Sequence, residues 1–171
     1  MYEVVAIFQR EDVGMSEDEV LNFFRVASNS VDELDRKEIM NAVRYAVAEI
    51  EKATHYALVG KDVDLYYYEI RKDDVLPYAP CSVISLSIDN QIAEIGDYFS
   101  SGVYPVCKKD ATNMSVSVTG GYSQMPDDWK ELVLRLAAIR LDTKGGSESE
   151  DKEVMLMREI KRRKRGQFLI C

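Results

Sequence analysis

The chain has 171 residues, 46% of them hydrophobic, and a formal net charge of −8 at pH 7. A chain of this length can bury a core without disulfides or metals, and no apolar run approaches the roughly 20 residues that span a bilayer. The amino terminus becomes charged too soon for a signal peptide, so we expect a cytosolic protein with no membrane partner. The odd, widely spaced Cys81, Cys107 and Cys171 indicate neither a disulfide framework nor a zinc site.

The charge is unevenly distributed along the chain. Residues 152–171 hold seven basic and two acidic residues, a net charge of +5, which leaves −13 for residues 1–151. An acidic body does not bind nucleic acid over its general surface, because phosphates need cations to displace their condensed counterions. The basic tail suits either a nucleic acid or an acidic protein surface.

The chain begins with signals for a strand and a helix. The β-branched apolar run within residues 1–8 predicts a short strand. Ser16 and Glu19 have the spacing of a capping box, in which each side chain accepts from the other residue's amide. A helix of about three turns should follow and end at Ser28.

A long amphipathic helix comes next. Asp35 and Glu38 predict a second capping box at its start, and Gly60 is the expected stop. Apolar residues recur between them at three- and four-residue spacing, as on the buried face of a helix: Ile39, Val43, Ala46, Val47, Ile50, Ala53 and Ala57.

The period then changes to that of strands. Apolar and polar residues alternate in two segments, with Ile84, Leu86 and Ile88 on one face and Met114, Val116 and Val118 on another. The closely spaced candidates imply an antiparallel sheet, because no helix lies between them. They are Val63–Arg71, Ser82–Asp89, Ile92–Phe99, Val103–Lys108 and Met114–Thr119.

Pro126 should begin another helix, apolar over most of its circumference and therefore in need of partners on several sides. Residues 144–151 (KGGSESED) predict a flexible linker. Beyond it, Val154, Met157 and Ile160 form a seam too thin to fold alone, so a helix there needs a surface to lie against. We therefore expect an α+β fold, a helical bundle packed with a small antiparallel β-sheet, over residues 1–143, followed by the linker and a basic tail or helix at 152–171.

Residues with catalytic or metal-binding chemistry are sparse. His55, the only histidine, has no nucleophile near it in sequence. Gly120-Gly121 lacks both phosphate-loop patterns, and neither Asp73-Asp74 nor Asp127-Asp128 lies in a calcium loop. The sequence predicts no catalytic residue, no metal site and no cofactor.

Apolar and aromatic residues offer candidates for contacts between subunits instead. Tyr66, Tyr67 and Tyr68 alternate across a predicted strand, and tyrosine is enriched at protein interfaces. Half-buried tyrosines of an ordinary sheet would have the same pattern. Trp129 and Leu134 belong to the helix that needs several partners, some of which could come from another subunit.

Four stretches follow one another in a distinctive order. They are the helix over 16–24 (SEDEVLNFF), the long helix ending with Ile50, Glu51 and Thr54, the Leu-Pro-x-x-Pro turn and strand over 76–89, and the strand, Gly-Tyr turn, Pro and helix over 116–141. In this order they resemble the head–tail connector (adaptor or head-completion) proteins of tailed bacteriophages, over residues 16–142. The amino-terminal strand has no counterpart in that pattern, and residues 139–142 replace its usual Tyr-x-x-Arg-like ending.

The resemblance implies a structural subunit of a ring, usually twelve-fold, in the neck of the virion. Such a ring docks on the portal, extends the channel through which DNA passes during packaging and ejection, and joins the next neck or tail component; it is assembled in the host bacterial cytoplasm. The family's carboxy-terminal extension engages the portal. Here the corresponding residues are Arg158, Lys161, Arg162, Arg163, Lys164, Arg165 and Phe168.

Alternatives remain for the tail and for the whole chain. The tail could order as a helix on an acidic or apolar partner surface, stay solvated, or contact DNA phosphates directly. A nucleic-acid-binding module using this tail is the second reading of the chain. A small enzyme with unrecognised catalytic residues is the third.

Overall fold

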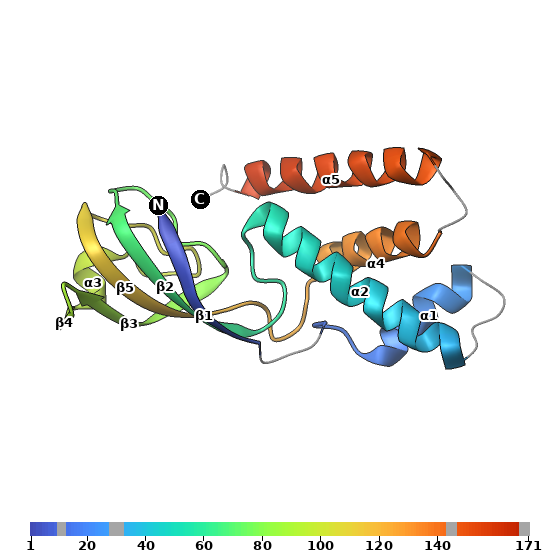
Figure 1. Cartoon of the computed structure of the whole chain (residues 1–171), viewed down its shortest axis with the longest axis horizontal. Helices are drawn as coiled ribbons and strands as arrows, with labels where there is room; N and C mark the ends of the chain where they lie inside the picture. Colours follow the sequence, from blue (N-terminus) through green and yellow to red (C-terminus); the bar gives the residue numbers. More distant parts are fainter. Residues whose placement is uncertain (10–12, 28–32, 143–146, 168–171) are drawn as a thin grey trace. The chain divides into compact units, whose positions relative to one another are not determined.

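The computed structural model describes residues 1–9, 13–27, 33–142 and 147–167 (Figure 1). Its backbone contacts divide the chain into two compact units. One unit consists of Met1–Asp12 with Tyr56–Ser123 and holds the sheet; the other consists of Val13–His55 with Gln124–Cys171 and holds four helices. Each unit is therefore built from segments distant in sequence, a division different from the single domain over residues 1–143 that we expected. No helix in the described part of the chain is long and apolar enough to cross a membrane.

The first unit is an antiparallel sheet with the strand order β1-β2-β5-β3-β4, as the absence of intervening helices predicted. Together with the helical unit it confirms the α+β class. Its elements are β1 (Tyr2–Gln9), β2 (Lys61–Ile70), β3 (Cys81–Ile88), β4 (Gln91–Ile92), the short helix α3 (Ile95–Tyr98) and β5 (Ala111–Gly120).

Two of the expected strands were wrong. The segment Ile92–Phe99 contains only the end of β4 and then helix α3. The segment Val103–Lys108 forms isolated bridges, Val106 with Val75 and Cys107 with Phe99, in place of a strand. Short apolar runs such as these carry no decisive period, so their sequence does not distinguish strand, helix and extended loop.

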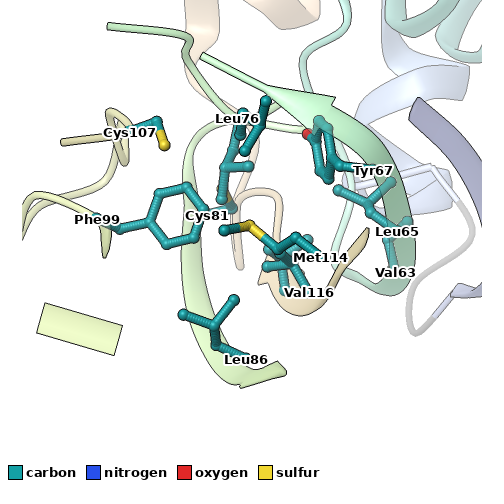
Figure 2. Close-up of a cluster of buried hydrophobic side chains, with 12 residues drawn as sticks. Val63, Leu65, Tyr67, Leu76, Cys81, Leu86, Phe99, Cys107, Met114 and Val116 are labelled. Atoms are coloured by element: carbon teal, nitrogen blue, oxygen red, sulfur yellow. The ribbon is translucent and has the colours of Figure 1, made fainter. Parts of the chain in front are cut away.

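The core of this unit lies on one face of the sheet (Figure 2). The predicted alternation of β5 is confirmed, with Met114, Val116 and Val118 all buried. The predicted alternation of β3 is confirmed for Leu86 and Ile88, which pack in the core, but was wrong for Ile84, because a register shift lies between Val83 and Ser85. This irregularity leaves Ile84 60% exposed, while Leu86 returns to the core.

The second unit contains α1 (Glu17–Ala27), α2 (Glu33–Thr54), α4 (Asp127–Leu141) and α5 (Ser147–Gln167). The first capping box is confirmed: the Ser16 amide donates to Glu19 Oε2 at 2.9 Å, and the Glu19 amide donates to Ser16 Oγ at 3.2 Å. The second was wrong, since α2 already begins at Glu33 and Asp35 is its third residue. Helix α5 begins at Ser147, so part of the expected linker over 144–151 is helical.

Helix α2 also ends earlier than expected. Its last residue is Thr54, and His55 takes a left-handed conformation (φ 57°) in place of the expected stop at Gly60. The Thr54 hydroxyl donates to the Ile50 carbonyl at 2.7 Å within the last turn. Ala57, which we expected on the apolar stripe of the helix, lies beyond the helix end and is buried within the sheet unit. Its amide donates to the Ala79 carbonyl of the same unit at 3.0 Å.

An ion pair connects α1 to α4. Lys130 Nζ lies 2.8 Å from Glu19 Oε1, so the Glu19 carboxylate accepts from Lys130 as well as from Ser16. These hydrogen bonds, the one from Lys130 first, lower the pKa of Glu19 from its ordinary 4.5 to about 2. A carboxylate whose pKa is lowered on folding stabilises the fold above its unfolded pKa, and this contribution is lost as the pH falls toward the folded pKa.

We therefore expect Glu19→Gln to destabilise the protein at pH 7 by about 1 kcal/mol, a figure limited by solvent screening of the half-exposed Glu19. The deficit should shrink as the pH is lowered from about 4.5 toward 2. Urea unfolding of wild type and variant at several pH values measures it. Glu17→Gln is the matched control, because Glu17 lies in the same helical turn but pairs with an exposed Arg36. An equal, pH-independent loss in both variants would contradict this account.

The Gly120-Gly121 pair allows two chain segments to approach closely. A Cβ on Gly121 would lie 2.1 Å from the Val59 carbonyl oxygen, and Gly121 has a φ of 90°. Its amide donates to the Pro80 carbonyl at 2.9 Å. Glycine is required here by both space and backbone conformation.

We expect Gly121→Ala to lower the free energy of unfolding by roughly 2–4 kcal/mol. Gly102→Ala, which has φ 124° but open space around the new Cβ, should cost only the backbone strain, about 1 kcal/mol. Gly96→Ala, with neither problem, should be nearly neutral. Denaturant unfolding of the three variants separates clash from strain, and an equal loss at Gly121 and Gly102 would exclude the clash.

Candidate assembly surfaces

The residues singled out for chemistry do not converge. Within the described ranges, no three His, Cys, Asp or Glu side chains group as a metal site requires. Cys81 and Cys107 are buried thiols, and burial raises the pKa of Cys81 to about 12. His55 lies just past α2, and Gly120-Gly121 serves the close backbone approach described above. The features that remain are surfaces.

Helix α5 lies against α2 and α4. Leu156 and Ile160 are its buried apolar residues. On either side of them, Arg140 of α4 pairs with Glu153 at 2.6 Å and Arg135 pairs with Glu159 at 3.6 Å. The helix thus has the supporting surface that its thin seam required, although the seam differs from the expected one: Val154 is half-exposed, and Leu156 takes its place.

The opposite side of α5 is basic. Arg158, Lys161 and Arg162 are exposed on it. Arg158 and Lys161 also line a shallow hollow of about 510 Å³, together with Glu153, Val154 and Met157. The helix continues through Arg163, Lys164 and Arg165, whose side chains are outside the described part, and Phe168 lies outside the described residues.

Three of the five side chains expected between subunits are core residues. Trp129 is 1% exposed, Leu134 is buried in the same helix, and Tyr67 is buried in the core of the sheet unit. Helix α4 finds its several partners within the chain, since α1, α2 and α5 all contact it. Its broad apolar surface therefore does not require another subunit.

Tyr66 and Tyr68 remain accessible. Their rings meet edge to face with centroids 5.0 Å apart on the side of β2 away from Tyr67. The Tyr66 hydroxyl donates to Asn113 Oδ1 at 3.2 Å, and a hydrogen bond to the Glu3 carboxylate raises the pKa of Tyr68. These two tyrosines therefore form an aromatic pair on β2, the strand next to β1, with a hydrogen bond at each hydroxyl.

Sequence reasoning missed a further exposed apolar surface. Strand β1 is at one edge of the sheet, and Val4, Val5, Ile7 and Phe8 are exposed on it. Across the sheet, Ile84 and Ile92 are exposed near the other edge and line a hollow of about 750 Å³ whose lining also contains Val5, Ser117 and Asp64. The missing signal was the strand order, which decides that β1 is an edge.

Solved structures of similar fold come from gene transfer agent (GTA) particles. The chain is similar in fold to a chain of a gene transfer agent neck. In "Neck of native GTA particle computed with C12 symmetry" the match covers 91% of this chain and 94% of the other, with 16% identity and a TM-score of 0.56. In "Neck of empty GTA particle computed with C6 symmetry" it covers 81% and 84%, with 19% identity and a TM-score of 0.59.

A third match is to "Virion of native gene transfer agent (GTA) particle", with 18% identity, a TM-score of 0.60 and coverage of 81% of this chain and 84% of the other. No protein-family model and no curated protein matches the sequence. At these identities the likeness concerns the fold. At that level it confirms the resemblance to head–tail connectors drawn from the order of the sequence motifs.

The docking of α5 depends on its two buried residues. We expect Ile160→Ala to remove about 2–5 kcal/mol, because Ile160 is fully buried between α5 and its partner helices. Hydrogen exchange of the α5 amides should accelerate more than that of α4, since α5 has the thinner seam. Met155→Ala, on the exposed side of the same helix, should change stability by less than about 0.5 kcal/mol. Equal effects of the two substitutions would contradict the described packing.

Proposed function

We propose that this protein is a structural subunit of the connector ring that joins the head of a phage-like particle to its tail. The observation that carries this proposal is the shared fold with chains of gene transfer agent neck structures over most of both chains. The order of sequence motifs, which resembles head–tail connectors, supports it independently. The protein would act in the virion neck after assembly in the host bacterial cytoplasm.

The ring would be twelve-fold. The symmetries named for the neck structures, C12 and C6, support a cyclic assembly of this order. Ring subunits associate head to tail through two different surfaces of the same chain. Tyr66 and Tyr68 are candidates for one of these surfaces because they are accessible and held in a fixed pair.

The basic side of α5 would dock on the portal. Arg158, Lys161 and Arg162 are exposed together there, and Arg163, Lys164, Arg165 and Phe168 continue the same segment in sequence. Such a surface fits an acidic partner through charge complementarity. Because α5 is already packed on α2 and α4, it would bind as a preformed helix and lose little entropy.

The ring would extend the DNA channel without binding DNA tightly. Residues 1–151 carry a net charge of −13, and an acidic wall does not attract the phosphate backbone. DNA would therefore pass freely during packaging and ejection, and the far side of the ring would receive the next neck or tail component. The role requires no enzymatic activity and no cofactor.

Electron microscopy of DNA-filled heads that end at a bare portal, after addition of this protein, tests the proposal. We expect a ring at that single vertex, with the symmetry giving the copy number. Reversing the charge of Arg158, Lys161 and Arg162 to Glu should weaken this addition by about tenfold or more. Reversal of Lys37, Lys52 and Lys72, exposed elsewhere, changes the net charge equally and is the matched control.

Two results would count against the proposal. Absence of the protein from the portal vertex would remove the connector role. If the test and control variants add equally poorly to the portal vertex, α5 does not contact the portal and the loss is a general effect of net charge.

The alternative is a nucleic-acid-binding module, favoured by the same three exposed cations. It predicts DNA binding whose logarithm falls with the logarithm of salt concentration at a slope of about −3 for three phosphate contacts. No measurable DNA affinity at low salt would exclude it.

A further inference from the structure

Strand β1 is an exposed and almost uncharged sheet edge (Figure 1). Six of its eight residues are exposed, and Glu3 is the only charged one. No other strand among the described residues lies on its outer side. Natural proteins protect such edges with lysine, proline, a β-bulge or a covering segment; β1 has one register shift, between Val4 and Ala6, but contains neither lysine nor proline. A partner that covers this edge is therefore expected.

The other edge of the sheet, at β3 and β4, presents a second apolar surface. Ile92 on β4 is 96% exposed, and Ile84 projects from the irregularity in β3. Both line the hollow of about 750 Å³, whose lining also includes Ser85, Ser87 and Ser117 and the carboxylates of Asp64 and Glu94. The small hydroxyl side chains leave room for larger side chains from a partner.

Electrostatics selects the partner. Two copies of a chain with a net charge of −8 repel each other over most of their surfaces. Strands β3 and β4 contain no charged residue, and β1 contains one. Apart from Asp64 and Glu94 at the hollow, these two edges carry little charge, so like-charged copies can approach there, and both expose large apolar side chains. Because the edges differ from each other, each copy can use one edge toward each of two neighbours.

We propose that the edge of β1 in one copy docks on the hollow beside β3 and β4 of the next copy. Phe8, which is 64% exposed, would enter the hollow between Ile84 and Ile92. This inference rests on the proposed ring and names the contact that closes it. The contact is head to tail, as a ring requires.

Side-chain packing supplies most of this contact. On its outer side β3 already pairs with β4 at Ser87 and Ile88, and a register shift against β5 bends the strand between Val83 and Ser85, so backbone pairing with β1 of the next copy would extend over few residues. On β1 a second register shift lies between Val4 and Ala6, and Val5 lines the hollow of the same copy. The exposed residues near the end of the strand are left for the neighbour.

Sedimentation velocity between about 1 µM and about 1 mM tests the contact with two blocked edges. Phe8→Lys blocks the β1 side and Ile84→Lys blocks the hollow; each should weaken self-association at least tenfold. Lysine is the residue that natural edge strands carry, so both variants should fold, and Ile7→Lys, at a 49% exposed residue of β1 outside the lining of the hollow, is a second β1 variant. Val103→Lys, at a 55% exposed valine of the same unit that belongs to none of β1, β3 and β4 and does not line the hollow, is the matched control and should associate like wild type.

Mixing the two blocked variants decides whether the edges bind each other. Each retains one intact edge, so the mixture should form 1:1 dimers and nothing larger. Wild type that stays monomeric over the whole range, blocked variants that assemble like wild type, or a mixture without dimers would each overturn the inference.

The neck assay distinguishes this inference from the proposed function. Rings of Phe8→Lys at the portal vertex would overturn the edge contact and keep the connector role. Wild type that associates through its edges but never adds to the portal would keep the edge contact and remove the connector role.

Discussion

The apolar circumference of α4 is the constraint on which the helical unit depends. Trp129, Leu132, Val133, Leu136 and Ala137 are all buried, and a helix covered by one neighbour alone would leave part of this surface in water. Three helices from distant parts of the sequence supply the cover: α1 and α2 from the first third of the chain and α5 from its end. The interleaving of the two units in sequence follows, because α4 is reached only after the chain has passed through the sheet.

The same constraint orients α5. At about 100° per residue, Leu156 and Ile160 lie on one side of the helix, and Arg158, Lys161 and Arg162 lie on the other. Burying the two apolar residues against α2 and α4 therefore turns the three cations outward. Glu153 and Glu159 flank the buried side and pair with Arg140 and Arg135, so these two carboxylates are used within the chain. The outward side keeps an excess of positive charge.

Local rules predicted the parts of the fold that local interactions decide. The capping box at Ser16, the period of β5 and the antiparallel sheet were correct, because each depends on neighbours in sequence or on a uniform alternation. The irregularity at Ile84 and the end of α2 at His55 were missed. The first arises in the pairing of β3 with β5, and the second is followed directly by contacts of Tyr56 and Ala57 with the distant Ala79. Trp129, Leu134 and Tyr67 were expected at subunit contacts. An apolar surface has the same composition whether another part of the same chain or another subunit covers it, so the sequence did not distinguish the two.

The positions of the charged residues, more than their overall number, indicate which kind of partner each surface suits. A uniformly acidic chain of net charge −8 would repel its own copies and any acidic partner alike. Here the excess of positive charge is in residues 152–171, whereas strands β1, β3 and β4 together contain one charged residue, Glu3. An acidic partner is attracted to the first surface but has no electrostatic reason to occupy the edges, and another copy meets the least repulsion at the edges. This separation reduces competition between the two kinds of partner for one surface. The proposed connector subunit, which would bind both its neighbours and a portal, would need such a separation.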